Sequence, residues 1–402
     1  MTMVMQIMGK SKMNLFKEFE CKQVKKYTEN TFGDAFLLKN NHHTGRAIGI
    51  LSDGLGSGVK ANILANMTAT MAMKFTESNM NFLQSAEIIM DALPICQVRK
   101  VAYSTYTIVD CSYDNKVRII EQGNPPFILL RNNKSVDVEY HEYVSKHKDY
   151  RKLRLSEFSI EPNDRIIFFS DGVTEAGIGT KAYPLGWRRD GCIKFVEEYV
   201  SKNEDISARD FANTIVSKAC SKEPGMKPGD DVSCSVVYFR EPRRTMLVSG
   251  PPFSKNRDNE YAQRTFEFQG KKIISGGTTA EIVSRELKKK ITTDLARMRR
   301  CKLPPISKMD GIDLVTEGIL TLTEVLRILK KKVDYSEQNG ATKIVELLLE
   351  SDVIHFIIGT KINEAHQDPS LPVDLEIRRS LIKQIAKTLE YKYYKQVDVE
   401  YI

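Results

Sequence analysis

The chain has 402 residues, of which 41% are hydrophobic and 28% charged, and these ordinary globular values argue against a disordered or fibrous protein. The net charge of +8 is modest for this length, and the basic clusters contain no interleaved aromatic residues, so we expect no binding to nucleic acid. No apolar run approaches the ~20 residues that cross a bilayer. The N-terminal residues do not resemble a signal peptide, and the 7 cysteines form no C-x-x-C pair. We therefore expect a cytoplasmic protein with reduced thiols and no membrane span.

The first strong strand signal, Arg46 to Leu51, ends just ahead of Asp53. A glycine-rich turn, Gly54 to Gly58, follows it, and apolar spacing then predicts helices over Val59–Phe75 and Phe82–Leu93. The turn lacks the Gly-Lys-Ser/Thr of a Walker loop and the third glycine of a dinucleotide fingerprint. We interpret it as a bend around Asp53.

Further strands are predicted at Tyr103–Val109, Val117–Glu121 and Phe127–Arg131, and the turn residues between them favour consecutive antiparallel hairpins. Another strand, Arg165–Phe169, ends just ahead of Asp171. A helix over Phe211–Cys220 and a strand over Ser233–Phe239 close this region. The polar stretch at 240–244 is interpreted as a linker, which gives domains at 1–244 and 245–402.

After residue 244 the pattern changes to repeated units of strand, turn and helix, which predicts a second, α/β domain of Rossmann-like type. The predicted strands are Thr245–Val248, Lys271–Ser275, Gly311–Val315 and Val353–Ile358. The predicted helices are Glu281–Lys290, Leu322–Lys332, Thr342–Leu349 and Ile377–Leu389. Ligands of such folds bind at the carboxyl ends of the strands.

Four acidic positions accompany the strands of the first domain: Asp34, Asp53, Asp171 and the pair Asp230-Asp231. Each one alone is also a common turn former. Together they form a set of oxygen ligands, which selects Mg²⁺ or Mn²⁺ over softer-ligand metals. Two such ions could generate a hydroxide and stabilise charge during the hydrolysis of a phosphate ester.

The ordered motifs GD at 33–34, SDGLGSG at 52–58, GNPPF at 123–127, SDGVTE at 170–175 and GDDVS at 229–233 extend over roughly residues 20 to 240. This region resembles the SpoIIE-type branch of the metal-dependent (PPM) protein serine/threonine phosphatases. The resemblance implies an α+β fold in which two antiparallel sheets form a sandwich flanked by helices, with two Mn²⁺ or Mg²⁺ ions and hydrolysis of phosphoserine or phosphothreonine.

The same resemblance implies which residues act at the site. Asp34, Asp53, Asp171 and Asp230 would be the catalytic metal ligands, and Gly54 would offer its carbonyl. Asp231 is the alternative to Asp230, which the alignment of the motif favours. Eukaryote-like members hold the phosphate with an arginine ahead of the first acid, whereas Lys25, Lys26 and Thr28 stand near that place in this chain.

The resemblance also implies regulation and partners. The two helices at 59–75 and 82–93 would form a switch and a dimer contact, although their methionine-rich faces also suit ordinary core packing. The implied substrates are phosphorylated anti-sigma-factor antagonists or related signalling proteins. A catalytically silent scaffold that binds phosphoproteins is the alternative from a binding class.

The second domain has one candidate ligand loop, formed by Gly276, Gly277, Thr278 and Thr279 between a strand and a helix. Its amides and hydroxyls could hold a small phosphorylated ligand at the helix N-terminus. The alternative is a tight turn in which Thr279 is the N-cap. We expect this domain to regulate the first, or to sense a nucleotide or metabolite with the phosphatase as its output.

Overall fold

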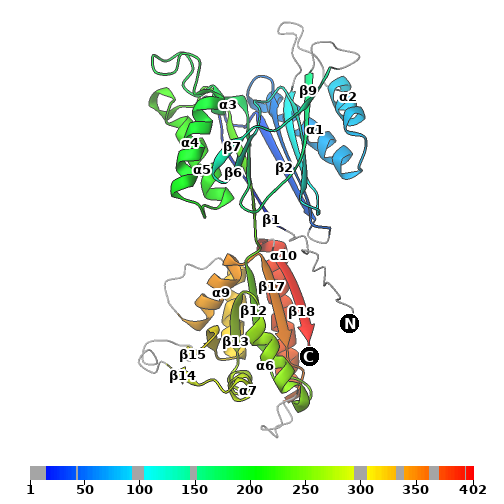
Figure 1. The fold of residues 1–402 in the computed structure, drawn as a ribbon, viewed down its shortest axis with the longest axis vertical. Helices are drawn as coiled ribbons and strands as arrows, with labels where there is room; N and C mark the ends of the chain where they lie inside the picture. The colour runs from blue at the N-terminus through cyan, green and yellow to red at the C-terminus, as the bar shows by residue number, and fades with distance from the viewer. Residues whose placement is uncertain are drawn as a thin grey trace, which may run out of the picture. The chain divides into compact units, whose positions relative to one another are not determined.

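The computed structural model describes residues 15–41, 44–92, 104–144, 152–293, 306–331, 339–361, 371–393 and 395–402. The chain divides into two compact units, Met1–Glu241 and Pro242–Ile402 (Figure 1). Each unit has its own sheets and its own hydrophobic clusters.

The first unit is a sandwich of two antiparallel sheets with helices on both outer faces (Figure 1). One sheet has the order β1-β11-β10-β6-β7, with β1 Phe16–Val24, β6 Ile128–Arg131, β7 Lys134–Val136, β10 Arg165–Phe169 and β11 Val232–Arg240. The other has the order β2-β3-β4-β5-β9-β8, with β2 Asp34–Asn41, β3 Arg46–Gly54, β4 Ser104–Cys111, β5 Lys116–Gln122, β8 His141–Val144 and β9 Lys152–Ser159. This architecture is the α+β sandwich expected for the first domain.

Two pairs of helices cover the sandwich. The helices α1 Gly58–Glu77 and α2 Phe82–Ala92 pack on the six-stranded sheet, and α4 Arg188–Lys202 and α5 Ala208–Cys220 pack on the five-stranded sheet. The short α3 Asp171–Thr174 follows β10, and the 3₁₀ turn η1 Pro224–Met226 precedes β11.

The side chains of β3 show why this strand is buried on both faces. Ile48 and Ile50 join the cluster under α1, while Ala47 and Leu51 join the cluster between the two sheets. Successive residues of a strand point to opposite faces, so the apolar run RAIGIL supplies both layers. Phe19 of β1 fills the space left by the missing side chain of Gly49.

The prediction of consecutive hairpins is confirmed for β4 and β5 and is wrong for β5 and β6. Strand β5 pairs with β4 and β9, whereas β6 pairs with β10 and β7 in the other sheet. The reason lies in the connecting residues, because Pro125 and Pro126 have no N–H to continue a ladder and Gly123 adopts a φ of +81°. The chain therefore crosses from one sheet to the other at GNPPF.

The second unit is an α/β layer structure. Five parallel strands lie in the order β16-β13-β12-β17-β18, namely β12 Arg244–Ser249, β13 Lys271–Ser275, β16 Ile312–Thr316, β17 Val353–Ile358 and β18 Gln396–Tyr401. An antiparallel edge, β14 Ile291–Thr293 and β15 Ser307–Met309, extends it into a mixed sheet. One face of the sheet is covered by three helices, α8 Ile319–Lys331, α9 Gly340–Glu350 and α10 Leu371–Tyr393. The other face is covered by α6 Asp258–Glu267 and α7 Gly277–Leu287. The 3₁₀ turn η2 Lys255–Arg257 precedes α6.

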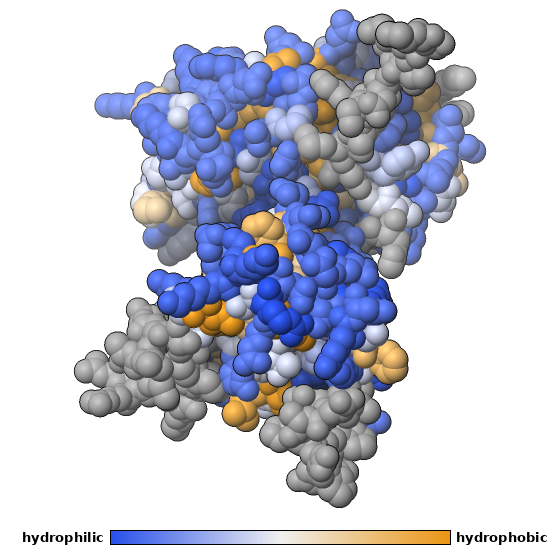
Figure 2. Space-filling view, turned by 60° about the horizontal axis from the view of Figure 1, so that its bottom comes forward, coloured by the Kyte–Doolittle hydropathy of each residue, from blue (hydrophilic) through white to orange (hydrophobic). Residues whose placement is uncertain are grey.

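The surface offers no apolar belt on the face seen in Figure 2, where hydrophilic side chains predominate and hydrophobic ones form small separate groups. In the described part of the chain, no helix has the length and apolar character needed to cross a membrane.

Candidate functional site

Two of the predicted acids face each other in one sheet. Asp34 begins β2 and pairs directly with Asp53 near the end of β3. The Gly54 amide donates to the Gly33 carbonyl at 3.3 Å, and any side chain on Gly54 would overlap the carbonyl of Ala61 in α1. Glycine is therefore required where β3 turns into the helix, and its close packing fixes the position of Asp53.

The other acids come from the second sheet. Asp171 follows β10 and the Asp230-Asp231 pair precedes β11, which is the neighbouring strand. The Ser170 amide donates to the Ser233 carbonyl at 3.0 Å, and the Ser233 amide donates to Ser170 Oγ at 3.1 Å. A side chain on Gly172 would overlap the Asp231 carbonyl. The turn that carries Asp171 thus lies directly against the acidic pair.

The sandwich brings these two pairs of strand ends together. Asp53 is repelled by Asp34, Asp171 and Asp230, and its carboxyl hydrogen-bonds with that of Asp171. Asp34 in turn is repelled by Asp231 and Asp171. Acids that are far apart in the sequence therefore form one cluster.

Burial and mutual repulsion shift the protonation of this cluster. Desolvation raises the pKa of Asp34 to about 7, with repulsion from Asp231 and Asp171 adding to the shift and the hydroxyls of Ser233 and Ser170 opposing it. Desolvation is also the first cause that raises the pKa of Asp53, well above its usual range, and of Asp171. Positive charge placed among these groups would favour their ionised forms.

The side chains of this cluster offer the oxygen atoms that a hard cation binds. Asp34 is 3% exposed, and its Oδ2 has no hydrogen-bond partner in the described structure. Oxygen-only donors of this kind suit Mg²⁺ or Mn²⁺. No group of three His, Cys, Asp or Glu side chains among the described residues is already arranged to hold a metal ion.

The two adjacent acids, Asp230 and Asp231, have different surroundings. Asp231 accepts from the backbone amides of Lys26 at 3.1 Å and Gly33 at 2.9 Å, so its carboxylate ties the segment before β2 to β11. Asp230 Oδ1 accepts a local bond from the Asp231 amide at 2.9 Å. Asp231 has the anchoring role, and Asp230 retains more free acceptor capacity.

Sequence reasoning missed one acid at this place. Glu175 is exposed, and desolvation, followed by repulsion from Asp171 and Asp230, raises its pKa. It is the last residue of SDGVTE, so the motif contained the signal. Desolvation raises the pKa of Asp230 and Asp231, and the Lys26 ammonium, which opposes this shift, brings positive charge to the same edge.

The candidate ligand loop of the second unit has one member already engaged. Helix α7 begins at Gly277 with Gly276 as its N-cap at a φ of 130°, so the alternative that made Thr279 the N-cap is wrong. Thr279 is buried, and its Oγ1 accepts from the Gly250 amide at 2.8 Å. Gly277 and Thr278 are exposed at the start of the helix.

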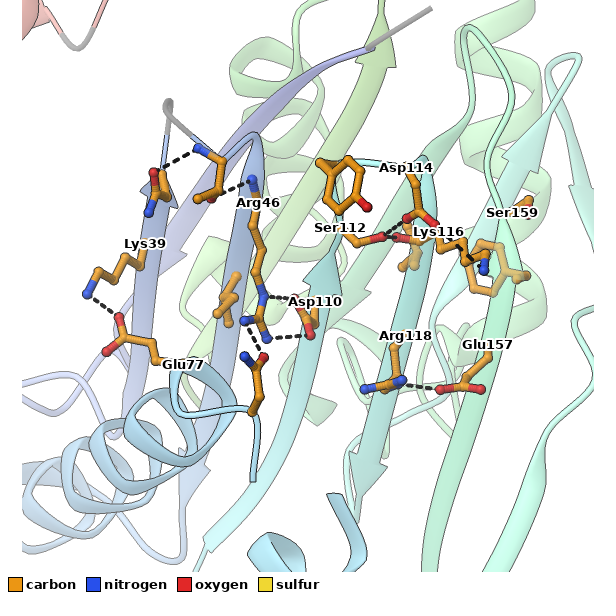
Figure 3. Close-up of a pocket in the computed structure, with 17 residues that line it drawn as sticks. Lys39, Arg46, Glu77, Asp110, Ser112, Asp114, Lys116, Arg118, Glu157 and Ser159 are labelled. Atoms are coloured by element: carbon orange, nitrogen blue, oxygen red, sulfur yellow. Dashed lines mark hydrogen bonds and ion pairs between the residues drawn. The ribbon is translucent and has the colours of Figure 1, made fainter. Parts of the chain in front are cut away.

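A separate cavity of about 1000 Å³ lies at the opposite end of the β2–β3 ladder from the acids (Figure 3). Arg46 donates there to both carboxylate oxygens of Asp110 at 2.8 and 2.9 Å, to the Thr76 carbonyl at 2.8 Å and to Asn79 Oδ1 at 2.7 Å. Ion pairs also join Lys39 to Glu77 and Arg118 to Glu157. This cavity contains none of the predicted acids, and its charges hold the C-terminal end of α1 on the sheet.

A family model described as Stage II sporulation protein E (SpoIIE) matches residues 43–240. The solved phosphatase domain of SpoIIE from Bacillus subtilis is 15% identical, with a TM-score of 0.42, over 57% of this chain and 94% of that chain. RsbX in complex with magnesium is 16% identical, with a TM-score of 0.40, over 56% and 99%. The RsbU and RsbW domains of a Mycobacterium tuberculosis protein are 14% identical, with a TM-score of 0.44, over 63% and 70%. No curated protein matches this chain in sequence.

The matched region begins after β2, so it contains Asp53, Asp171, Asp230 and Asp231 and leaves Asp34 outside. Residues 43–240 thus belong to a SpoIIE domain, within the PPM family of serine/threonine phosphatases.

Proposed function

We propose that this protein is a Mn²⁺- or Mg²⁺-dependent phosphatase that hydrolyses phosphoserine or phosphothreonine on a signalling protein. The observation that carries the proposal is the convergence of carboxylates from the strand ends of two different sheets, with Asp53 interacting with Asp34, Asp171 and Asp230. Asp34 is buried, Asp53 and Asp171 are half-buried, and Asp230 is exposed at the edge of the cluster. Carboxylates that are crowded together and partly desolvated in this way repel one another, and a bound cation would compensate their charge. Other acids of the described residues have a positively charged partner, as Asp110 has in Arg46 and Asp164 in Arg131.

Asp34, Asp53, Asp171 and Asp230 would hold two ions, together with the Gly54 carbonyl. When bound, such ions supply a hydroxide at neutral pH and stabilise the charge of the phosphoryl group. Asp231 would keep the segment around Gly33 in place through its two amide contacts. Lys26 would add positive charge beside the acids, where the incoming phosphate is negative.

The described cysteines give no support to a cysteine-dependent phosphatase. Burial raises the pKa of the thiols of Cys21, Cys111, Cys192, Cys220 and Cys234. Such groups remain protonated at neutral pH, whereas a cysteine nucleophile must be a thiolate.

The regulatory part of the proposal concerns the second unit and the helices α1 and α2. A small phosphorylated ligand would bind near Gly276, Gly277 and Thr278, with Thr279 holding the loop through Gly250. The substrate would be a phosphorylated anti-sigma-factor antagonist or a related protein in the cytoplasm, and α1 and α2 would provide the switch and a homodimer contact.

The test is hydrolysis of an aryl phosphate and of a phosphoserine peptide by the full chain with Mn²⁺, with Mg²⁺ and with chelator. Turnover should require metal and should be lost in Asp171→Asn. Asp114→Asn is the matched control, because Asp114 lies in the β4–β5 turn at the far end of the sheet. Full activity of Asp171→Asn would overturn the assignment, and absence of turnover with every metal would favour the scaffold.

A further inference from the structure

Two loops beside the acids are joined into one structure. The first, residues 175–187, follows α3, and the second, residues 221–230, precedes β11. The Gly177 amide donates to Glu223 Oε1 at 2.9 Å, and Lys222 Nζ donates to the Tyr183 hydroxyl at 2.7 Å. The Lys222 ammonium also lies 4.2 Å from the ring centre of Tyr183 and 4.9 Å from that of Trp187, which is buried. These contacts hold the two loops in a fixed arrangement.

The same loops are attached to the acidic cluster. The Glu175 amide donates to the Asp171 carbonyl at 2.8 Å, and the Ile178 amide donates to the Glu175 carbonyl at 2.8 Å. Gly186, at a φ of +76°, lies so close to Glu175 that an added side chain would be 2.7 Å from its Cα. The second loop ends in Asp230 itself. Any macromolecule that presents a phosphorylated residue to the acids must therefore lie next to these loops.

Three large apolar side chains on these loops point into solvent. Ile178 is 57% exposed, Leu185 69% and Met226 66%, although the polar groups around them are engaged within the protein. Met226 also has a φ of +55°, a conformation that non-glycine residues other than Asn and Asp rarely adopt. Exposed apolar groups and strained backbone at one place are typical of a contact surface.

We propose that Ile178, Leu185 and Met226 form a docking surface for the protein substrate and select phosphorylated residues that have apolar neighbours. This inference rests on the proposed function, because it places the phosphate at the adjacent acids. The surface is continuous with that position through Glu175 and Asp230, so the occupant is the substrate itself. A second copy of the chain is the competing occupant.

The experiment compares two phosphoserine peptides of equal charge, one flanked by Leu and Ile and the other by Ser and Gln, with an aryl phosphate as the reference substrate. The full chain with Mn²⁺ should prefer the apolar-flanked peptide by about tenfold in kcat/KM. A triple variant, Ile178→Gln, Leu185→Gln and Met226→Asn, should lose this preference through a higher KM. Asparagine is chosen at 226 because it tolerates a positive φ.

Tyr113→Gln is the control, since Tyr113 is 69% exposed but lies at the cavity of Figure 3, away from the acids. It should retain the full peptide preference. Fluorescence anisotropy with the same two peptides gives a readout without turnover, and the wild type should bind the apolar-flanked peptide about tenfold more tightly.

The outcomes separate the two proposals. Aryl phosphate turnover without any peptide preference, in both kinetics and binding, would overturn the docking surface alone. Absence of metal-dependent turnover together with a retained binding preference would overturn only the proposed function. A change of oligomeric state in the triple variant with an unchanged preference would assign the surface to a second copy of the chain.

Discussion

Asp53 lies in β3 of one sheet and Asp171 directly follows β10 of the other, and the repulsion between their carboxylates opposes the closure of the sandwich in the absence of a cation. Replacing either by asparagine removes one negative charge and keeps the shape. We therefore predict that Asp53→Asn and Asp171→Asn are folded and, without metal, at least as stable as the wild type. Addition of Mn²⁺ should raise the melting temperature of the wild type by several degrees and leave both variants nearly unchanged.

Differential scanning fluorimetry with and without Mn²⁺ measures this effect independently of activity. Asp114→Asn, in the turn between β4 and β5, should respond to Mn²⁺ like the wild type. Equal Mn²⁺ responses of all four proteins would contradict a metal site at these acids.

Glu121 is a buried acid outside the cluster, and it gives a pH prediction. It is 4% exposed, its Oε1 accepts from the Phe127 amide at 2.7 Å, and Arg154 Nε lies 3.8 Å from Oε2. Desolvation raises its pKa to about 7, while Arg154, the Phe127 amide and Arg189 oppose the shift. In the unfolded chain Glu121 ionises near pH 4.5, whereas in the native state it stays protonated up to about pH 7. The free energy of unfolding therefore loses nothing from this group below pH 4.5 and decreases as the pH rises to about 7.

Glu121→Gln cannot ionise but can still accept from the Phe127 amide. The difference in unfolding free energy between variant and wild type should therefore move in favour of the variant between pH 4.5 and pH 8, by about 3 kcal/mol at most. Urea unfolding followed by the fluorescence of Trp187, the only tryptophan of the chain, measures it. Parallel pH profiles of the two proteins would show that Glu121 ionises normally.

At the scale of elements, local patterns predicted most of the first unit, and the missing parts depended on distant contacts. The bounds of α1 and β10 follow from apolar spacing and from a strand-like run, so both could be located from the sequence. The crossing from β5 to β6 could not, because GNPPF has the residues of a turn and only the pairing of β5 with β9 shows that no hairpin forms.

The C-terminal end of α1 is held by the contacts of Arg46, which the sequence did not indicate. Arg46 joins β3 to Asp110 in β4 (Figure 3). It also donates to the carbonyl of Thr76 in the last turn of α1. The two side chains of the ion pair are 23% and 9% exposed, so solvent screens them only in part. Arg46→Ala should destabilise the first unit by about 2 kcal/mol, and Asp110→Ala by a similar amount.

The double variant should cost clearly less than the sum of the two single ones, because the interaction can be lost only once. Arg118→Ala is the matched control in the same cavity, where Arg118 is 40% and its partner Glu157 56% exposed. It should cost less than about 1 kcal/mol. Additive effects of Arg46→Ala and Asp110→Ala would contradict a coupled contact.

At the scale of the whole molecule, the sequence identified the acids more readily than it identified their surroundings. Asp34, Asp53, Asp171 and Asp230 stand beside strand signals and turn residues, so each was visible locally. Their convergence depends on the face-to-face packing of two sheets, for which the family resemblance supplied the expectation. The anchoring contacts of Asp231 join residues that are far apart in the chain, and no local pattern announces them.

The two units should also unfold separately. Each hydrophobic cluster in the described residues lies within one unit, the clusters around Phe168, Phe211 and Ile50 in the first and those around Phe356 and Tyr261 in the second. Burial of apolar side chains is the main stabilising contribution to folding, so two separate sets of clusters predict two cooperative transitions. Calorimetry of the full chain should resolve them, and Trp187 fluorescence should follow only the transition of the first unit.

Phe356→Ala truncates a buried side chain of the second unit. It should lower the free energy of unfolding of that unit by about 3 kcal/mol or more and leave the transition followed by Trp187 unchanged. A shift of both transitions by this substitution would show that the units fold as one.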